Sequence, residues 1–140
     1  MKKIASLLIV DDNEFDLLLT RTVLQKTGRV QHIYAVTDGA EALALFQNYE
    51  ESRRKHPEAF PPLMILLDIN MPLMGGFEFL SAYAQMEGGI EQDPSVVVML
   101  TSSSFDNDRQ RAMEHPLVKD YVVKPITRER AIELAESFGV

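Results

Sequence analysis

The sequence contains no cysteine, and its charge is strongly unbalanced toward the acidic side. Without cysteine the chain can form no disulfide, no thiol nucleophile and no metal site with Cys ligands. Lysine and arginine total 14 against 21 aspartate and glutamate residues, which gives a net charge of -7. Because an acidic domain repels phosphate backbones, we expect no direct binding of nucleic acid.

Long apolar segments are also missing, and no stretch of the chain is long enough to span a bilayer. The N-terminal ten residues briefly resemble a signal peptide. Their apolar stretch is short, however, no small-residue cleavage site follows, and Asp11 and Asp12 end it, so a first β-strand explains the stretch better. We therefore expect a cytoplasmic protein with no membrane partner.

The 140 residues have the length of one ordinary domain, and 46% of them are hydrophobic, enough for a core without cross-links. Four segments are rich in aliphatic or β-branched residues, and a fifth, more mixed, is expected nearer a sheet edge. Continuous apolar runs of this kind are typical of parallel strands that are covered on both faces. The four are residues 4–10, 63–67, 96–100 and 121–123, and the mixed one is 30–36.

Helical patterns separate these segments. Apolar side chains recur at helical spacing in residues 13–26, 42–49, 77–84 and 127–138. In the first, Phe15, Leu18, Leu19 and Thr22 form the apolar stripe, and Gly28 follows where a C-terminal glycine belongs. Residues 105–114 are mostly charged, which predicts an exposed and loosely held helix.

Strands that alternate with helices predict an α/β fold with a parallel sheet and right-handed crossovers. Five strands with a helix after each give a small doubly wound, flavodoxin-like domain with strand order 2-1-3-4-5. We find no internal repeat or linker, so the prediction is one domain over residues 1–140.

Polar residues follow four of the predicted strands. They are Asp11 and Asp12 after the first, Asp68 after the third, Thr101 after the fourth and Lys124 after the fifth. In an open parallel sheet, ligands bind beyond the carboxyl ends of the strands. These strands are neighbours in the predicted order, so three carboxylates, a hydroxyl and an ammonium group should converge at one edge.

Each of these residues also has a simpler explanation. An acid in the Asp11 region could cap the next helix, Asp68 could start a turn, and a lone lysine is usually a solvated surface charge. Each explanation is plausible by itself. The coincidence of all of them at four neighbouring strand ends favours a functional site.

The residue types indicate the chemistry of such a site. Clustered carboxylates repel one another, which raises their pKa values or requires a cation. Hard oxygen ligands without His or Cys suit Mg2+, which commonly bridges to a phosphoryl oxygen. Lys124 and Thr101 could bind further phosphoryl oxygens, which leaves one carboxylate free to attack phosphorus. The three histidines have no catalytic or metal-ligand spacing.

Four motifs, taken together and in order, resemble the receiver domain of bacterial two-component response regulators, of the stand-alone, chemotaxis-regulator-like type. The resemblance covers essentially the whole chain. The motifs are LIVDDN at residues 8–13, LLDINMPLMGG at 66–76, MLTS at 99–102 and KDYVVKP at 119–125. One departure is Gly75, where the family often has an acid, and we expect only a local loop effect from it.

The resemblance implies a role for each site residue. Asp68 would accept a phosphoryl group from a sensor histidine kinase or a histidine phosphotransfer protein. Mg2+ would be bound by Asp12, Asp68 and the backbone carbonyl of Asn70, with Asp11 acting mostly through water. Lys124, which precedes a cis peptide bond in the family, would pair first with Asp68 and then with the phosphoryl group.

The resemblance also implies how the signal leaves the domain. Thr101 would move toward the phosphoryl group, Tyr121 would turn inward, and a protein-interaction face would change shape for a downstream protein or a second copy in a homodimer. The protein would not be an enzyme beyond slow loss of its own phosphoryl group. No output domain is expected, because the sequence ends soon after the last helix.

Two polar segments, residues 50–62 and 88–94, are longer than such a fold needs. We hypothesise that they form one enlarged surface for a protein partner, at the end of the sheet opposite the phosphoryl site. The alternative, that they are tolerated surface insertions, is somewhat favoured.

Three other functions are alternatives to a phosphoacceptor domain. A haloacid-dehalogenase-type phosphatase uses similar residues, but its nucleophile lies on the first strand and its paired acids come late, the reverse of the order here. A flavin carrier needs a phosphate loop after the first strand, where Asp11 and Asp12 would repel the phosphate. An adaptor that never accepts phosphate is disfavoured because no site position is missing.

Overall fold

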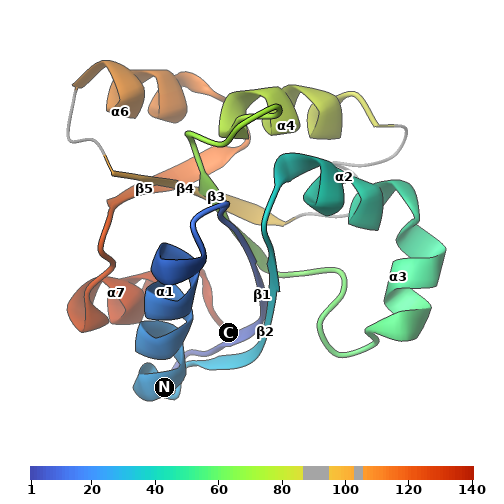
Figure 1. The fold of residues 1–140 in the computed structure, drawn as a ribbon. Helices are drawn as coiled ribbons and strands as arrows, with labels where there is room; N and C mark the ends of the chain where they lie inside the picture. The colour runs from blue at the N-terminus through green and yellow to red at the C-terminus, as the bar shows by residue number, and fades with distance from the viewer. Residues whose placement is uncertain (87–94, 103–105) are drawn as a thin grey trace.

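A five-stranded parallel sheet with strand order β2-β1-β3-β4-β5 forms the centre of the protein, as the sequence predicts (Figure 1). The structure, a computed structural model, describes residues 1–86, 95–102 and 106–140. Four strands lie within one residue of their predicted bounds, whereas β5 begins three residues earlier than predicted. The strands are β1 (Ile4–Val10), β2 (Val30–Val36), β3 (Met64–Asp68), β4 (Val96–Thr101) and β5 (Val118–Val123).

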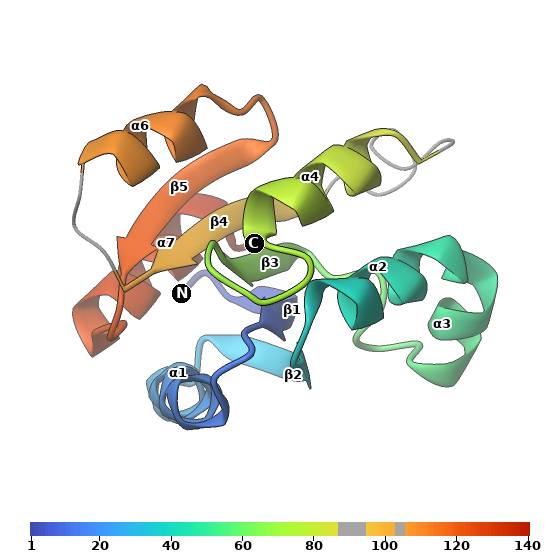
Figure 2. The same ribbon diagram turned by 45° about the horizontal axis from the view of Figure 1, so that its top comes forward.

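Helices cover both faces of the sheet. Helices α1 and α7 lie together on one face, and α2, α4 and α6 lie on the other (Figures 1 and 2). The longest described helix has 14 residues, and in the parts of the chain that the structure describes no helix is long and apolar enough to cross a membrane. The helices are α1 (Glu14–Thr27), α2 (Gly39–Gln47), α3 (Tyr49–Lys55), α4 (Gly76–Ala84), α6 (Asp106–Glu114) and α7 (Arg128–Phe138).

The central strands are buried on both sides, which explains their unbroken apolar runs. Alternate residues of β3 point to opposite faces. Ile65 and Leu67 join the core beneath α2 and α4, whereas Met64 and Leu66 join the core beneath α1 and α7. β2 lies at one edge of the sheet and is mostly half-buried, as its mixed composition predicts.

Capping residues fix where the helices begin relative to the strands. Asn13 accepts a hydrogen bond at 3.0 Å from the backbone N–H of Asp16, and so starts α1 directly after β1. Asp38 caps α2 in the same way through Glu41. At the other end of α1, Gly28 has a φ of 68°, a left-handed conformation that favours glycine.

The apolar stripe predicted for α1 does not face the sheet. Its stripe of Phe15, Leu18 and Leu19 is 70%, 62% and 40% exposed, respectively. The buried residues of the helix are Thr20 and Leu24, which lie on a different side of it. Because α1 carries apolar residues on two sides, their spacing alone does not determine which side meets the sheet.

Residues 50–62 are not a loose insertion. They include most of α3, in which the hydroxyl of Ser52 donates a hydrogen bond at 2.8 Å to the carbonyl oxygen of Leu45. Phe60 is buried, with its ring centroid 5.3 Å from that of Phe46 and 5.1 Å from that of Tyr49. The segment therefore extends the core. The other half of the hypothesised surface, residues 88–94, lies outside the described residues.

Candidate functional site

The register of the sheet brings the predicted site residues to one edge. Val10 pairs with Leu67, which places the start of the β1–α1 connection beside Asp68. Asp68 in turn pairs with Leu100, one residue before Thr101. The edge strand β5 completes the set, because the backbone N–H of Lys124 donates a hydrogen bond at 2.7 Å to the carbonyl oxygen of Thr101.

Three carboxylates meet at this edge. Asp11, Asp12 and Asp68 each offer an oxygen, and these oxygens lie within 4.8 Å of one another. Asp11 and Asp68 are buried and Asp12 is exposed, so the cluster opens to solvent on the side of Asp12. Backbone N–H groups hold the buried pair: Asn13 donates to Asp11 Oδ1 at 3.0 Å, and Asn70 donates to Asp68 Oδ1 at 3.3 Å.

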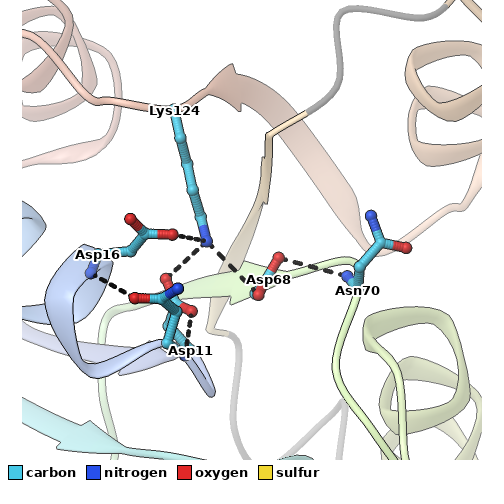
Figure 3. Close-up of polar contacts among 6 residues, drawn as sticks. Asp11, Asp16, Asp68, Asn70 and Lys124 are labelled. Carbon is cyan, nitrogen blue, oxygen red and sulfur yellow. Dashed lines mark hydrogen bonds and ion pairs between the residues drawn. The ribbon is translucent and has the colours of Figure 1, made fainter.

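The ammonium group of Lys124 lies among the carboxylates (Figure 3). Its Nζ is 2.8 Å from Asp11 Oδ2, 3.2 Å from Asp16 Oδ2 and 3.5 Å from Asp68 Oδ2. The contact with Asp16 is a hydrogen bond. The shorter contact with Asp11 is an ion pair. The predicted cis bond between Lys124 and Pro125 is present.

Asp16 is the residue of this site that the sequence analysis missed. It lies in the first turn of α1 rather than at a strand end. Its spacing from Asp11 gives no signal, because the strand ends at Val10 and the chain reverses into a helix between the two acids. Only the cap at Asn13, three residues before Asp16, could have indicated that this side chain returns toward the sheet.

The local electrostatics show that the site is short of positive charge. Burial, with a further contribution from the nearby Asp11, raises the pKa of Asp68 to about 7, although Lys124 opposes this rise. Burial also acts to lower the pKa of Lys124, but the carboxylates around it outweigh that effect and hold the pKa above its usual value. A single ammonium group therefore does not balance the acids.

The donor set fits a hard divalent cation. All three candidate ligands are carboxylates, and the described residues of the cluster include no His. Asp11 Oδ2 is buried and pairs with Lys124, and it accepts no hydrogen bond from the residues that the structure describes, so it could also take one from a water bound to such an ion. The side chain of Asn70 points away from the cluster, so only its backbone could contribute (Figure 3).

Thr101 and Tyr121, the predicted switch pair, lie on neighbouring strands and on the same face of the sheet. Thr101 pairs with Val123, and Tyr121 precedes Val123 by two residues, so the alternation of β-strands places both side chains on one side. Thr101 is fully buried. Tyr121 is half-buried and packs against the core beneath α2 and α4. Their coupled movement stays a prediction.

The fold and this edge of the sheet define a known family. Residues 7–136 match the family model described as response regulator receiver domain. Since the match covers nearly the whole chain, the protein belongs to the receiver domains of two-component systems, as the four sequence motifs predict.

Curated relatives place similar domains in several kinds of protein. The chain is 32% identical to the probable methanogenesis regulatory protein FilR2 of Methanothrix harundinacea, over 88% of this chain and 74% of that protein. It is 28% identical to the polar-differentiation response regulator DivK of Brucella ovis, over 95% of this chain and 94% of DivK. It also matches the sensor histidine kinase GacS of Pseudomonas protegens at 31% identity, but spans only 12% of that protein.

Solved structures agree with the assignment. A two-component response regulator from Cytophaga hutchinsonii superposes with a TM-score of 0.83 and 30% identity, over 98% of both chains. The Mn2+-bound response regulator Rcp1 superposes with a TM-score of 0.68 and 28% identity, over 95% of this chain and 90% of Rcp1.

Proposed function

We propose that this receiver domain accepts a phosphoryl group on Asp68 from a phosphohistidine of a sensor kinase or a histidine phosphotransfer protein. The observation that carries the proposal is the geometry of one sheet edge. Two buried carboxylates, a third exposed carboxylate and the ammonium group of Lys124 lie within a few ångströms of one another there. Charged side chains are seldom clustered in a partly buried site for structural reasons alone, so the cluster indicates a functional site.

Asp68 is the nucleophile in this proposal. A carboxylate oxygen of Asp68 forms a bond to phosphorus as the bond from phosphorus to the donor nitrogen breaks, and the donor, already protonated on its other ring nitrogen, leaves as neutral imidazole. The N–H of Asn70 holds the other oxygen, Oδ1, so that Oδ2 is left for the reaction on the side of Lys124. The product is an acyl phosphate on the protein.

The neighbouring side chains stabilise charge as it develops. Lys124 supplies a point charge for a phosphoryl oxygen, and the hydroxyl of Thr101 is the proposed donor to another. Asp12, Asp68 and the Asn70 carbonyl would hold Mg2+, with Asp11 acting through water, and the bound ion would supply the remaining positive charge.

A protein donor has a surface to bind beside the site. Phe15, Leu18 and Leu19 expose apolar side chains on α1. Phe15 and Leu19 also line a groove of about 310 Å³ together with Ser102 and Lys124. An exposed apolar patch that continues into a groove at a reactive residue is typical of a protein-binding surface.

We further propose that the domain is a signalling switch rather than a turnover enzyme. The acyl phosphate would be lost only slowly by hydrolysis, and its presence would alter the face around Tyr121 for a downstream protein or a second copy. A receiver that obtains its phosphoryl group from an ATP-dependent kinase would act in the cytoplasm, where ATP is available.

Intact-mass measurement tests the proposal. The wild-type chain, incubated with acetyl phosphate and Mg2+, should gain one phosphoryl group, and Asp68→Asn should gain none. Asp38→Asn is a matched control, because it makes the same chemical change at a helix cap where asparagine also serves. A phosphoryl group that persists in Asp68→Asn would move the acceptor elsewhere. Repeated release of phosphate from an ester would instead indicate a phosphatase.

A further inference from the structure

We propose that Asp16 is a positioning residue that holds the ammonium group of Lys124 on the α1 side of the site, in competition with the phosphoryl group. The inference rests on the proposed function, in which Asp68 is the acceptor and Lys124 neutralises the transferred group. The side chain of Asp16 contacts Lys124, and it would act through that residue.

The ammonium group of Lys124 lies nearer to Asp11 and Asp16 than to Asp68. Among the hydrogen bonds described for the structure, Asp16 is the carboxylate that receives one from Nζ, at 3.2 Å. Asp68 is the most distant of the three acids around Nζ, at 3.5 Å. Figure 3 shows Lys124 reaching down from its own strand end, with Asp16 on one side and Asp68 on the other.

The backbones around this contact are fixed. The side chain of Asn13 accepts a hydrogen bond from the N–H of Asp16, and the buried residues Thr20 and Leu24 hold α1 against the rest of the protein. The backbone of Lys124 is bound to Thr101. Movement is therefore left to the side-chain ends. The ammonium group lies nearest Asp11, at 2.8 Å, and from there it can turn toward Asp16 or toward Asp68.

A phosphoryl group on Asp68 would need the same ammonium group. While Nζ is bound to Asp16 it cannot stabilise the charge on the phosphoryl oxygens. This competition should slow both the formation and the hydrolysis of the acyl phosphate. The side chain of Lys124 is 10% exposed and that of Asp16 is 33% exposed, so the competition is partly screened by water. Removing a partly exposed ion pair of this kind should change the rates of phosphorylation and hydrolysis by roughly two- to fivefold.

A simpler role for Asp16 is an acid in the first turn of a helix, where negative charge is favourable. Glu14 occupies the same turn and already serves that role. Glu14→Gln is therefore the matched control: it removes the same charge from the same turn, and Glu14 is not among the acids around Lys124.

The test measures phosphorylation by acetyl phosphate in the presence of Mg2+, and decay after the donor is removed, by intact mass over time. In Asp16→Asn both rates should rise about two- to fivefold. Asp16→Glu restores the charge and should stay near the wild-type rates, and Glu14→Gln should match the wild type. In a Lys124→Met background, followed over longer times, Asp16→Asn should change neither rate, because the residue acts through the ammonium group.

Three results would overturn the inference while leaving the acceptor role of Asp68 intact. They are rates in Asp16→Asn that equal or fall below the wild type, an equal acceleration in the Lys124→Met background, and an equal acceleration in Glu14→Gln. A wild-type chain that takes no phosphoryl group on Asp68 would overturn both the proposed function and this inference.

Discussion

Replacing Asp68 with asparagine should stabilise the metal-free protein while removing its response to Mg2+. The folded state raises the pKa of Asp68 from 3.8 to about 7 through burial and the neighbouring Asp11. A tenfold change in an ionisation constant corresponds to about 1.4 kcal/mol, so the upper bound on the cost of the ionised carboxylate is about 4 kcal/mol. Local rearrangement and water entry reduce such costs, and we expect about 2 kcal/mol above pH 8.

The pH dependence follows from the same shift. Between about pH 4 and pH 7 the folded state of the wild type binds more protons at Asp68 than the unfolded state does, so this residue's contribution to stability is complete at low pH and is lost as the pH rises through about 7. Asp68→Asn lacks this loss. The difference in the free energy of unfolding between variant and wild type should therefore be small at pH 4 and grow toward pH 8.

Urea unfolding in EDTA at several pH values measures this difference, with Asp38→Asn as the matched control for the chemical change. Adding Mg2+ at ten times its dissociation constant should then stabilise the wild type by about 1.4 kcal/mol. The same addition should leave Asp68→Asn nearly unchanged. Our assignment of Asp68 to a crowded acidic site would be refuted by a variant less stable than the wild type at pH 8 in EDTA, or by an equal response of both proteins to Mg2+.

Three further predictions concern the surroundings of the site. Leu73 has a φ of 68° and a fully exposed side chain, so Leu73→Gly should raise the free energy of unfolding by about 0.5–1 kcal/mol, and a lower value would show that the turn is not strained. Phe60→Ala should lower the free energy of unfolding in urea by about 3–5 kcal/mol, because it opens a cavity in the aromatic cluster. A decrease below about 1 kcal/mol would indicate that residues 50–62 are a surface insertion after all. Leu18→Ser should slow phosphorylation by a phosphohistidine protein severalfold without changing the rate with acetyl phosphate, and equal rates with both donors would exclude α1 from the docking surface.

The sequence was sufficient to predict the sheet and most of the site for one physical reason. Parallel strands covered on both faces are continuous apolar runs, and their ends are where the chain leaves the core. The residues after those runs, such as Asp68 and Lys124, therefore mark the functional edge directly. The edge strand β5 was harder to delimit, because Lys119 and Asp120 interrupt its first half with polar side chains.

Features that depend on side-chain direction were not predictable in the same way. The apolar spacing of α1 allows two faces, and only packing shows that Leu24 points inward and Leu18 outward. Asp16 joins the site because the helix returns it toward Lys124, which no strand-end pattern encodes. The polar composition of residues 50–62 concealed Phe60, the aromatic residue through which the segment packs against Phe46 in the core.

The central claim is that the phosphoryl group resides on Asp68, and locating the modified residue tests it most directly. The chain is phosphorylated with acetyl phosphate and Mg2+ and reduced with borohydride, which converts an aspartyl phosphate to homoserine, and its peptides are then sequenced by mass spectrometry. The account predicts homoserine at position 68 and none at positions 11, 12 or 16. Homoserine at one of those three positions, or a phosphate that survives the reduction on another residue, would contradict it.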